Sequence, residues 1–271
     1  MAMPNNLVLV RHGRSKGNEA RAAERQGDES LFTPEFREQP GHRWDLTSEG
    51  EEQARCAGRF LLKQFGIDAF DRYIYSPYVR PRKTAGFVGQ VAAPNAKWTH
   101  DRRLRERDWG DLDNMPYKEY VKGYPENAAR KQTDPLYWAP VGGGESIAQV
   151  SNRFRDFLVT LHRECEAKNV LVSVHGEFMW VARLVLEYMS DETWLRLKRD
   201  ASQNIPNGAV LHYTRINPET QEQARSMHWV SQTNTWTRNE NGLIVPQEES
   251  GLWQYFEKPH YTNEQLLAMD D

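Results

Sequence analysis

The chain has 271 residues, of which 38% are hydrophobic and 27% are charged, and its formal net charge is -3. A chain of this size can bury a full core, which suits one large α/β domain with appended segments. Because Lys and Arg are not in overall excess, we expect no general nucleic-acid or membrane-surface binder, although local basic clusters can still hold small anions.

The N-terminal segment MAMPNNLVLV has no basic region and only a short apolar run, so it predicts neither a signal peptide nor a membrane anchor. No stretch of the sequence approaches the ~18 apolar residues of a spanning helix. The two cysteines, Cys56 and Cys165, are expected to be free thiols in a reducing compartment. Together these features predict a cytoplasmic protein.

Short apolar runs alternate with helical patterns, beginning with a buried strand over 7–10 that ends directly at the tripeptide RHG. Residues 20–45 are polar and contain two prolines, which predicts a surface excursion with one short helix. A helix over 48–65 follows, and Ser48 with Glu51 three residues later predicts a capping box at its start.

Further along the chain, a strand is predicted over 72–75, followed by a helix whose first turn contains Pro81. Residues 145–167 repeat apolar side chains at spacings of three and four, which predicts the clearest helix of the chain. The remaining predicted elements are a buried strand over 170–174, a helix over 178–189, a strand over 210–213 and, after Thr214, a meander with a turn near 239–242.

This alternation predicts an α/β fold with three layers: a central, mostly parallel sheet with helices on both faces, lid-like insertions and a C-terminal extension. We expect one domain over 1–214 and an extension over 215–271 that packs on it. The stretches 19–44 and 115–141 are expected to hang over the functional crevice as a lid, where loops commonly determine specificity.

Two segments, LVLVRHG and VLVSVHG, each run a predicted buried strand into a His-Gly pair, at His12 and at His175. In an open α/β sheet, ligands bind outside the carboxyl ends of the strands, so both histidines are expected to project into one crevice. The glycine after each histidine, which is Gly176 in the second pair, lets the backbone approach a ligand and leaves amide donors facing it.

Arginines accompany the histidines: Arg11 precedes the first one, and Arg80 follows the second predicted strand toward the same rim. A guanidinium offers a rigid fork of donors that suits phosphate oxygens. Asn18 would lie at the start of the helix after RHG, where donors favour an anion. The sequence therefore predicts a phosphate pocket, and because no metal-ligand spacing accompanies it, neither a catalytic metal nor a cofactor is expected.

Six blocks in chain order resemble the signatures of the histidine phosphatase superfamily, in its phosphoglycerate-mutase-like branch. They are RHGRSKGN (11–18), DLTSEGEEQA (45–54), SPYVRPRKTA (76–85), LRERDWGDLDN (104–114), GGGESIAQVSNRF (142–154) and SVHGEF (173–178). The resemblance runs from Leu7 to about Tyr213, which is most of the chain.

The resemblance implies phosphoryl transfer in two steps, through a phosphohistidine formed on His12. It also implies that Arg11, Arg80, His175 and backbone amides hold the phosphate oxygens, and that Glu106 protonates the leaving group and then activates water.

Arg14 departs from the family's pattern, in which the residue after RHG is usually Glu, Gln or small. Two interpretations stay open for Arg14: a cation at the pocket mouth that favours a substrate with a second anionic group, or a side chain turned to solvent.

The leading functional prediction is a phosphomonoester hydrolase that acts on a small phosphorylated metabolite. The first alternative is a cofactor-dependent phosphoglycerate mutase. Such mutases carry a longer segment and a fuller basic cluster between the acid and the second histidine, where this chain has only Arg130 and Lys131. The second alternative is a non-catalytic scaffold for phosphorylated ligands, although a binder has no need of a nucleophile such as His12. The sequence names neither the substrate nor the oligomeric state.

Overall fold

The computed structural model of the chain describes residues 2–247 and 249–268. Within these residues the main sheet has seven strands in the order β3-β2-β4-β1-β5-β6-β9. In chain order they are β1 (Asn6–Arg11), β2 (Arg72–Tyr75), β3 (Trp98–His100), β4 (Asn169–Val174), β5 (Val210–Thr214), β6 (Trp229–Thr233) and β9 (Trp253–Tyr255). Strands β3, β2, β4 and β1 run parallel, whereas β5, β6 and β9 are each antiparallel to the strand before them in the sheet.

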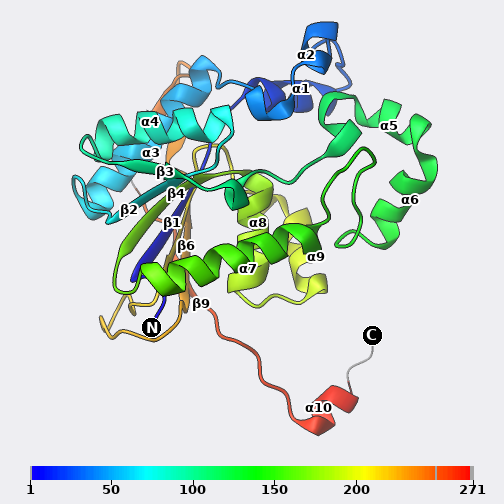
Figure 1. Cartoon of the computed structure of the whole chain (residues 1–271). Helices are drawn as coiled ribbons and strands as arrows, with labels where there is room; N and C mark the ends of the chain where they lie inside the picture. Colours follow the sequence, from blue (N-terminus) through cyan, green and yellow to red (C-terminus); the bar gives the residue numbers. More distant parts are fainter. Residues whose placement is uncertain (1, 248, 269–271) are drawn as a thin grey trace.

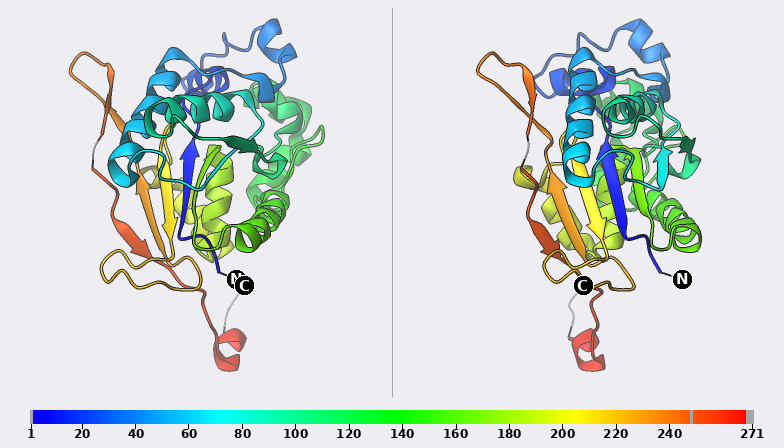
Figure 2. Two further views of the ribbon diagram at one scale, coloured as in Figure 1. Left: turned by 60° about the vertical axis from the view of Figure 1, so that its left-hand side comes forward. Right: turned by 90° about the vertical axis from the view of Figure 1, so that its left-hand side faces the viewer.

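Helices cover both faces of the sheet because successive strand residues point to opposite sides. On one side, Leu7 and Leu9 of β1 pack with α7 (Ile147–Glu164) and α8 (Gly176–Leu186). On the other side, Val8 and Val10 pack with α3 (Ser48–Phe65) and α4 (Val79–Ala92). The two layers of helices are visible on either side of the sheet in Figures 1 and 2, which confirms the predicted α/β fold.

Side chains at the N-cap positions accept hydrogen bonds from the first turns of the helices, and at α3 the cap differs from the one predicted. The first turn of α3 is capped by Thr47, whose Oγ1 accepts from the backbone N–H of Gly50 at 3.0 Å. The capping box predicted from Ser48 and Glu51 is therefore wrong, because Ser48 is already helical and Gly50, three residues after the cap, has no side chain that could complete a box with Thr47. In α7 the cap is Ser146, and the helix ends before Ala167, whose φ of 58° is incompatible with a right-handed helix.

The predicted lid segments contain more regular structure than the sequence suggested. Instead of one short helix, the first segment holds α1 (Lys16–Glu24), α2 (Pro34–Glu38) and the 3₁₀ helix η1 (Gly41–Arg43). The second holds α5 (Tyr117–Gly123) and α6 (Pro125–Thr133), preceded by the 3₁₀ helix η3 (Gly110–Asn114). Figure 1 shows both segments at the same end of the molecule, beyond the carboxyl end of β1.

The C-terminal part of the chain extends the main sheet through β6 and β9. Between them, β7 (Trp236–Arg238) and β8 (Ile244–Pro246) form a hairpin whose predicted turn is confirmed by the φ of 74° at Gly242. The short helix α10 (Asn263–Leu267) stands apart from the body of the molecule (Figures 1 and 2). The other short elements are η2 (Arg102–Leu104), α9 (Asp191–Arg199) and η4 (Ala201–Gln203). None of the helices in the described residues is long and apolar enough to cross a membrane.

Candidate active site

The two strand-end histidines leave the sheet side by side, because β1 and β4 are paired in parallel with Arg11 opposite Val174. The backbone N–H of His12 donates to the carbonyl of Val174 at 2.9 Å, and the ring centroids of His12 and His175 lie 5.2 Å apart. A cavity of about 950 Å³ opens at this edge, walled by the strand ends, α8, α9 and both lid segments. Of the residues predicted for the site, those that line it are Arg11, His12, Asn18, Arg80, Glu106 and Gly176.

His12 is buried, and its Nδ1 lies 2.7 Å from the carbonyl oxygen of Gly13. Because a carbonyl only accepts, this contact assigns the ring proton to Nδ1 and leaves a lone pair on Nε2. Arg80 donates from Nε to this Nε2 at 3.1 Å. Burial, followed by the positive charges of Arg80 and Arg11, lowers the pKa of His12 well below its usual value. At neutral pH the ring is therefore uncharged, and its Nε2 can act as a nucleophile.

His175 is fully buried behind the cavity wall. Its Nε2 forms a hydrogen bond of 2.7 Å with the hydroxyl of Ser76. Its Nδ1 is buried without a hydrogen-bond partner among the described residues and lies 4.0 Å from Oε2 of Glu106. Burial, and then the nearby Arg80, lowers its pKa well below the usual range. A buried polar nitrogen with no partner, beside His12, indicates a position where a ligand would complete the hydrogen bonding.

Arg11 offers a second unused donor. Its Nη1 donates to the carbonyl of Ile205, but its Nε is buried without a partner among the described residues. Burial lowers the pKa of this guanidinium to about 10, although Glu106 opposes the shift. A Cβ added at Gly176 would lie only 2.8 Å from that Nε, so glycine is needed where the guanidinium packs against the start of α8.

Arg80 is buried in the first turn of α4, directly after the strand β2 and the Ser76 turn. Besides the bond to His12, it donates from Nη1 to the carbonyl of Gly41 in the lid at 2.7 Å. Its Nη2 has no hydrogen-bond partner in the part of the chain that the structure describes. Two guanidiniums with free donors around one neutral imidazole suit the oxygens of a phosphoryl group.

Asn18 occupies the third position of α1, where its Oδ1 accepts from the backbone N–H of Ser15 and from Nδ2 of Asn207, both at 3.1 Å. Its own Nδ2 is therefore left for the cavity that it lines. Asn207 also donates to the carbonyl of His12 at 2.9 Å. No sequence signal had marked Asn207, which reaches the site from the loop before β5.

Arg14 does not lie along the cavity. Its guanidinium lies 3.4 Å from the carboxylate of Glu49 and 3.8 Å from that of Glu19. These carboxylates hold the side chain away from the pocket, so the expected second-anion contact of Arg14 has no support in its placement.

Glu106 lies in the loop after η2 and is largely buried, with 12% of its side chain exposed. Its Oε1 accepts from the backbone N–H of Arg107 at 3.0 Å and from that of Phe178 at 3.3 Å. Burial raises the pKa of this carboxyl, and repulsion from Glu177 adds to the effect, while Arg80 and Arg11 oppose it. A carboxyl with a raised pKa at the cavity wall can exist in the protonated form that a general acid requires.

The side chain of Arg107 does not line the cavity beside Glu106. Its guanidinium turns inward instead, where it contacts the carboxylate of Glu177 at 3.3 Å and donates to the carbonyls of Glu145 and Trp138. Alternate residues of an extended segment point to opposite sides, so the side chain next to Glu106 faces the interior and not the cavity.

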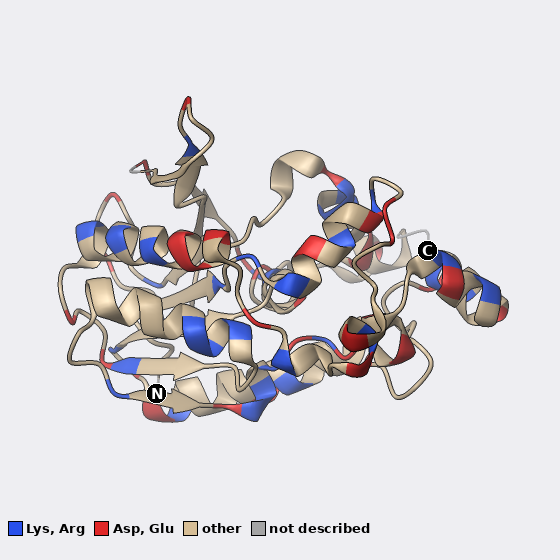
Figure 3. Cartoon of the chain, turned by 90° about the horizontal axis from the view of Figure 1, so that it is seen from above, with Lys and Arg blue, Asp and Glu red and all other residues tan. Residues whose placement is uncertain are grey.

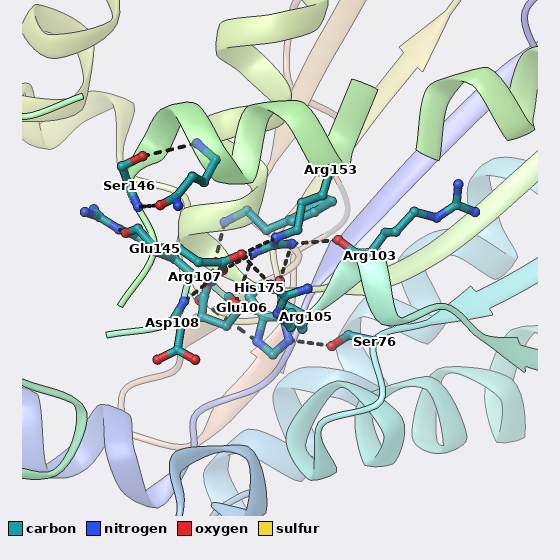
Figure 4. Close-up of polar contacts among 12 residues, drawn as sticks. Ser76, Arg103, Arg105, Glu106, Arg107, Asp108, Glu145, Ser146, Arg153 and His175 are labelled. Carbon is teal, nitrogen blue, oxygen red and sulfur yellow. Dashed lines mark hydrogen bonds and ion pairs between the residues drawn. The ribbon is translucent and has the colours of Figure 1, made fainter. Parts of the chain in front are cut away.

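A second arginine fixes the backbone around Glu106 (Figure 4). Arg153 of α7 donates to the carbonyls of Arg103, Arg105 and Glu106 at 2.6, 2.8 and 3.1 Å. Its guanidinium also pairs with Glu145 at 2.9 Å. Both residues belong to one motif block, in its GES and SNRF portions, but no local pattern indicated that their side chains support the Glu106 loop.

The loop after His12 is held in a similar way from α3 and α4. The backbone N–H of Gly13 donates to Oγ1 of Thr84 at 3.1 Å, and that of Arg14 donates to Oε1 of Gln53 at 2.8 Å. Thr84 and Gln53 belong to two of the motif blocks, and their side chains fix the backbone of the loop after His12. Because the N–H groups of Gly13 and Arg14 are used in these bonds, the phosphate-binding role expected for the amides after His12 has no support in this geometry.

The lid aromatics divide between the cavity and the lid's own core. Tyr117 lines the cavity, whereas Tyr120 and Trp138 are buried in a separate small cluster and Tyr137 is exposed. Lys131 also lines the cavity, with its Nζ 4.4 Å from the ring centroid of Tyr117. Both stretches predicted to overhang the crevice therefore contribute to its walls.

Among the described residues, one group could in principle hold a metal ion: ligand atoms of His12, Glu106 and His175 lie within 4.8 Å of one another. Arg11 and Arg80 adjoin the same space, and Arg80 already donates to the nitrogen that would bind the metal. Two adjacent guanidiniums repel a cation and attract an anion, so the arrangement fits a phosphoryl group better than a metal.

Comparisons with known proteins agree with this geometry. Residues 7–205 match the histidine phosphatase superfamily (branch 1). The 2,3-bisphosphoglycerate-dependent phosphoglycerate mutase of Allorhizobium ampelinum is 30% identical over 217 residues, covering 78% of this chain and 90% of the relative. The corresponding mutase of Bradyrhizobium diazoefficiens is 32% identical over 212 residues, covering 74% of this chain and 88% of the relative.

Solved structures share the fold at lower identity. The alpha-ribazole phosphatase of Shigella flexneri superimposes with a TM-score of 0.60 at 21% identity, covering 82% of this chain and 96% of that one. A mycobacterial glucosyl-3-phosphoglycerate phosphatase gives 0.57 at 21% identity, covering 77% and 89%. With most of its length matched in sequence and fold, the chain belongs to the histidine phosphatase superfamily (branch 1) and is an enzyme of phosphoryl transfer.

Proposed function

We propose that the enzyme hydrolyses a small phosphomonoester through a phosphohistidine on His12. The observation that carries this proposal is the state of His12: a neutral ring whose protonated Nδ1 is fixed by Gly13 and whose Nε2 faces Arg80 in the cavity. A nucleophile poised beside guanidiniums that can hold the phosphoryl oxygens is what covalent phosphoryl transfer requires.

In the first step, Nε2 of His12 attacks phosphorus while the bond to the ester oxygen breaks. The proton of the Glu106 carboxyl passes to the departing alkoxide. In the second step, the Glu106 carboxylate takes a proton from water, whose oxygen attacks phosphorus and breaks the P–N bond. Arg11, Arg80 and His175 hold the non-bridging oxygens through both steps, and the free donors described above support these roles.

A phosphoglycerate mutase is the second candidate, favoured by the curated relatives at 30–32% identity. A mutase must keep its phosphohistidine from water while the substrate reorients, which calls for further phosphate-binding groups in the cavity. Of the Arg130–Lys131 pair, Lys131 lines the cavity, whereas Arg130 pairs with Asp134 at the surface. Arg21, Arg25, Lys118 and Lys198 also line the cavity, although Arg21 donates to lid carbonyls and Lys198 pairs with Glu177. The preference for hydrolysis therefore rests on the short segment between Glu106 and His175.

An assay that follows two products separates these candidates. With 3-phosphoglycerate and a catalytic amount of 2,3-bisphosphoglycerate, we expect slow release of inorganic phosphate and little isomer exchange. We also expect p-nitrophenyl phosphate to be hydrolysed. Rapid formation of 2-phosphoglycerate with little free phosphate would instead establish the mutase, and no turnover of any phosphoester would favour a non-catalytic scaffold.

The charge of the cavity leads to a prediction about inhibitors. Vanadate and inorganic phosphate should inhibit competitively, because Arg11 and Arg80 offer free donors to a tetrahedral or bipyramidal oxyanion. EDTA should leave the rate of p-nitrophenyl phosphate hydrolysis within about twofold of the untreated enzyme, since no step uses a metal. Loss of activity in EDTA that a divalent cation restores would contradict a metal-free mechanism.

Three further expectations stay proposals. The buried free thiols of Cys56 and Cys165 support a place in the reducing cytoplasm. Lys and Arg are interspersed with Asp and Glu over the elements seen in Figure 3, which supports a small phosphoester and not a nucleic acid as the partner. The division into a domain over 1–214 and an extension over 215–271 is supported by the end of the family match at residue 205.

A further inference from the structure

We propose that Asp113 is a positioning residue that holds the phosphate-binding Arg80 in place through the backbone of Gly41. The proposal rests on the proposed function, in which Arg80 holds phosphoryl oxygens. Asp113 belongs to η3, which immediately precedes the second lid segment, and Gly41 begins η1 in the first, so the contact joins the two parts of the lid next to Arg80.

The path from Asp113 to Arg80 runs through two contacts on one residue. The carboxylate of Asp113 lies against the backbone of Gly41, whose N–H opposes the rise in the pKa of that carboxyl. The carbonyl of Gly41 accepts from Nη1 of Arg80 at 2.7 Å. A Cβ at residue 41 would collide with Oδ2 of Asp113, so the close approach requires glycine. The carboxylate thus fixes the orientation of the residue whose carbonyl orients the guanidinium.

Asp113 is itself held firmly. Arg21 of α1 donates to the backbone carbonyls of Asp113 and Met115 at 3.1 and 3.0 Å. Asn114 donates from Nδ2 to the carbonyls of Arg37 and Gln39 at 2.9 and 3.1 Å. These bonds act on backbone groups of both lid segments, so the position of Asp113 is determined by the lid and passed on to Arg80.

The electrostatics of Asp113 support the same role. Its side chain lines the cavity and is largely buried, and burial raises the pKa of its carboxyl while Arg80 and Arg21 oppose the shift. Asp108 repels it from the neighbouring loop. A buried guanidinium is costly without a counter-charge. Asp113 supplies that charge near Arg80 without touching the nitrogen that donates to His12.

The test compares three variants by steady-state kinetics with p-nitrophenyl phosphate and by inhibition with inorganic phosphate. Asp113→Ala removes the acceptor, and we expect KM and the phosphate Ki to rise about tenfold, more than kcat falls. Asp113→Asn keeps an oxygen against the backbone of Gly41 but loses the charge near Arg80, so its KM and phosphate Ki should fall between those of the wild type and Asp113→Ala. Glu119→Gln is the matched control, because it weakens the 2.7 Å ion pair with Arg37 that joins the same two segments but touches neither Gly41 nor Arg80.

Three outcomes would overturn the proposal. Asp113→Ala could bind phosphate as the wild type does, Asp113→Asn could be impaired as severely as Asp113→Ala, or Glu119→Gln could raise the phosphate Ki equally. Gly41→Ala gives an independent check if Asp113→Ala is unfolded by circular dichroism, since it breaks the same contact from the other side. If the wild type hydrolyses no phosphoester, the affinity of the same variants for inorganic phosphate can be measured by calorimetry. That measurement tests whether Asp113 positions Arg80 independently of the proposed function.

Discussion

Replacement of His12 by alanine is expected to lower kcat for p-nitrophenyl phosphate by ~10³-fold or more, because it removes the atom that forms the covalent intermediate. The neighbouring arginine side chains should keep their positions, because Arg80 retains its hydrogen bond to the carbonyl of Gly41 and Arg11 retains its hydrogen bond to the carbonyl of Ile205. The phosphate pocket therefore survives in outline, and binding of inorganic phosphate should weaken far less than kcat.

The intermediate itself gives the sharper measurement. Wild-type enzyme quenched during turnover of a ³²P-labelled substrate should carry label that is stable to alkali and labile to acid, as a phosphohistidine is. His12→Ala should carry none. His162→Ala is the matched control, since this histidine lies exposed on α7 away from the cavity and its loss should change neither label nor rate. Equal labelling of the wild type and His12→Ala would show that another residue is the nucleophile.

The central strands and the two histidines could be predicted because parallel strands buried on both faces are continuous apolar runs. Strands β1 and β4 are runs of this kind, and topology alone then brings His12 and His175 to one edge. Strand β3 was missed because its three residues are mostly exposed at the edge of the sheet and show no pattern. Its pairing with β2 is a tertiary contact that no local signal records.

Side-chain direction was the part that the sequence left open. Arg14 adjoins the RHG motif, yet Glu49 and Glu19 draw it away from the cavity. Arg107 faces the interior, and Asn207 enters from a distant loop. Each outcome depends on which partner the fold places nearby, because a long polar side chain reaches whichever opposite charge or free carbonyl is closest. Motif position identified the region, and only the packed structure assigned the contacts.

Glu106→Gln should produce the second largest loss, and its size should depend on the leaving group. Glutamine matches the shape of glutamate but cannot transfer a proton, so alkyl phosphates, whose alkoxide needs protonation, should slow by about 10²-fold or more. For p-nitrophenyl phosphate, whose phenolate leaves unaided, the loss in the first step should be less than about tenfold. Glu145→Gln would disturb Arg153 and the loop, so the better control is Asp156→Asn, an exposed residue that contacts Arg103.

The pH profile follows from the two pKa shifts. His12 must be neutral, and because its pKa is lowered well below 6.5, activity should fall only at strongly acidic pH. Glu106 must begin protonated, and because burial raises its pKa above 4.5, this form persists to higher pH and is lost as pH rises through the raised value. With an alkyl phosphate, kcat should therefore peak at mildly acidic pH and decline toward alkaline pH. Glu106→Gln should remove that alkaline decline, and an unchanged decline in the variant would show that a different group is the acid.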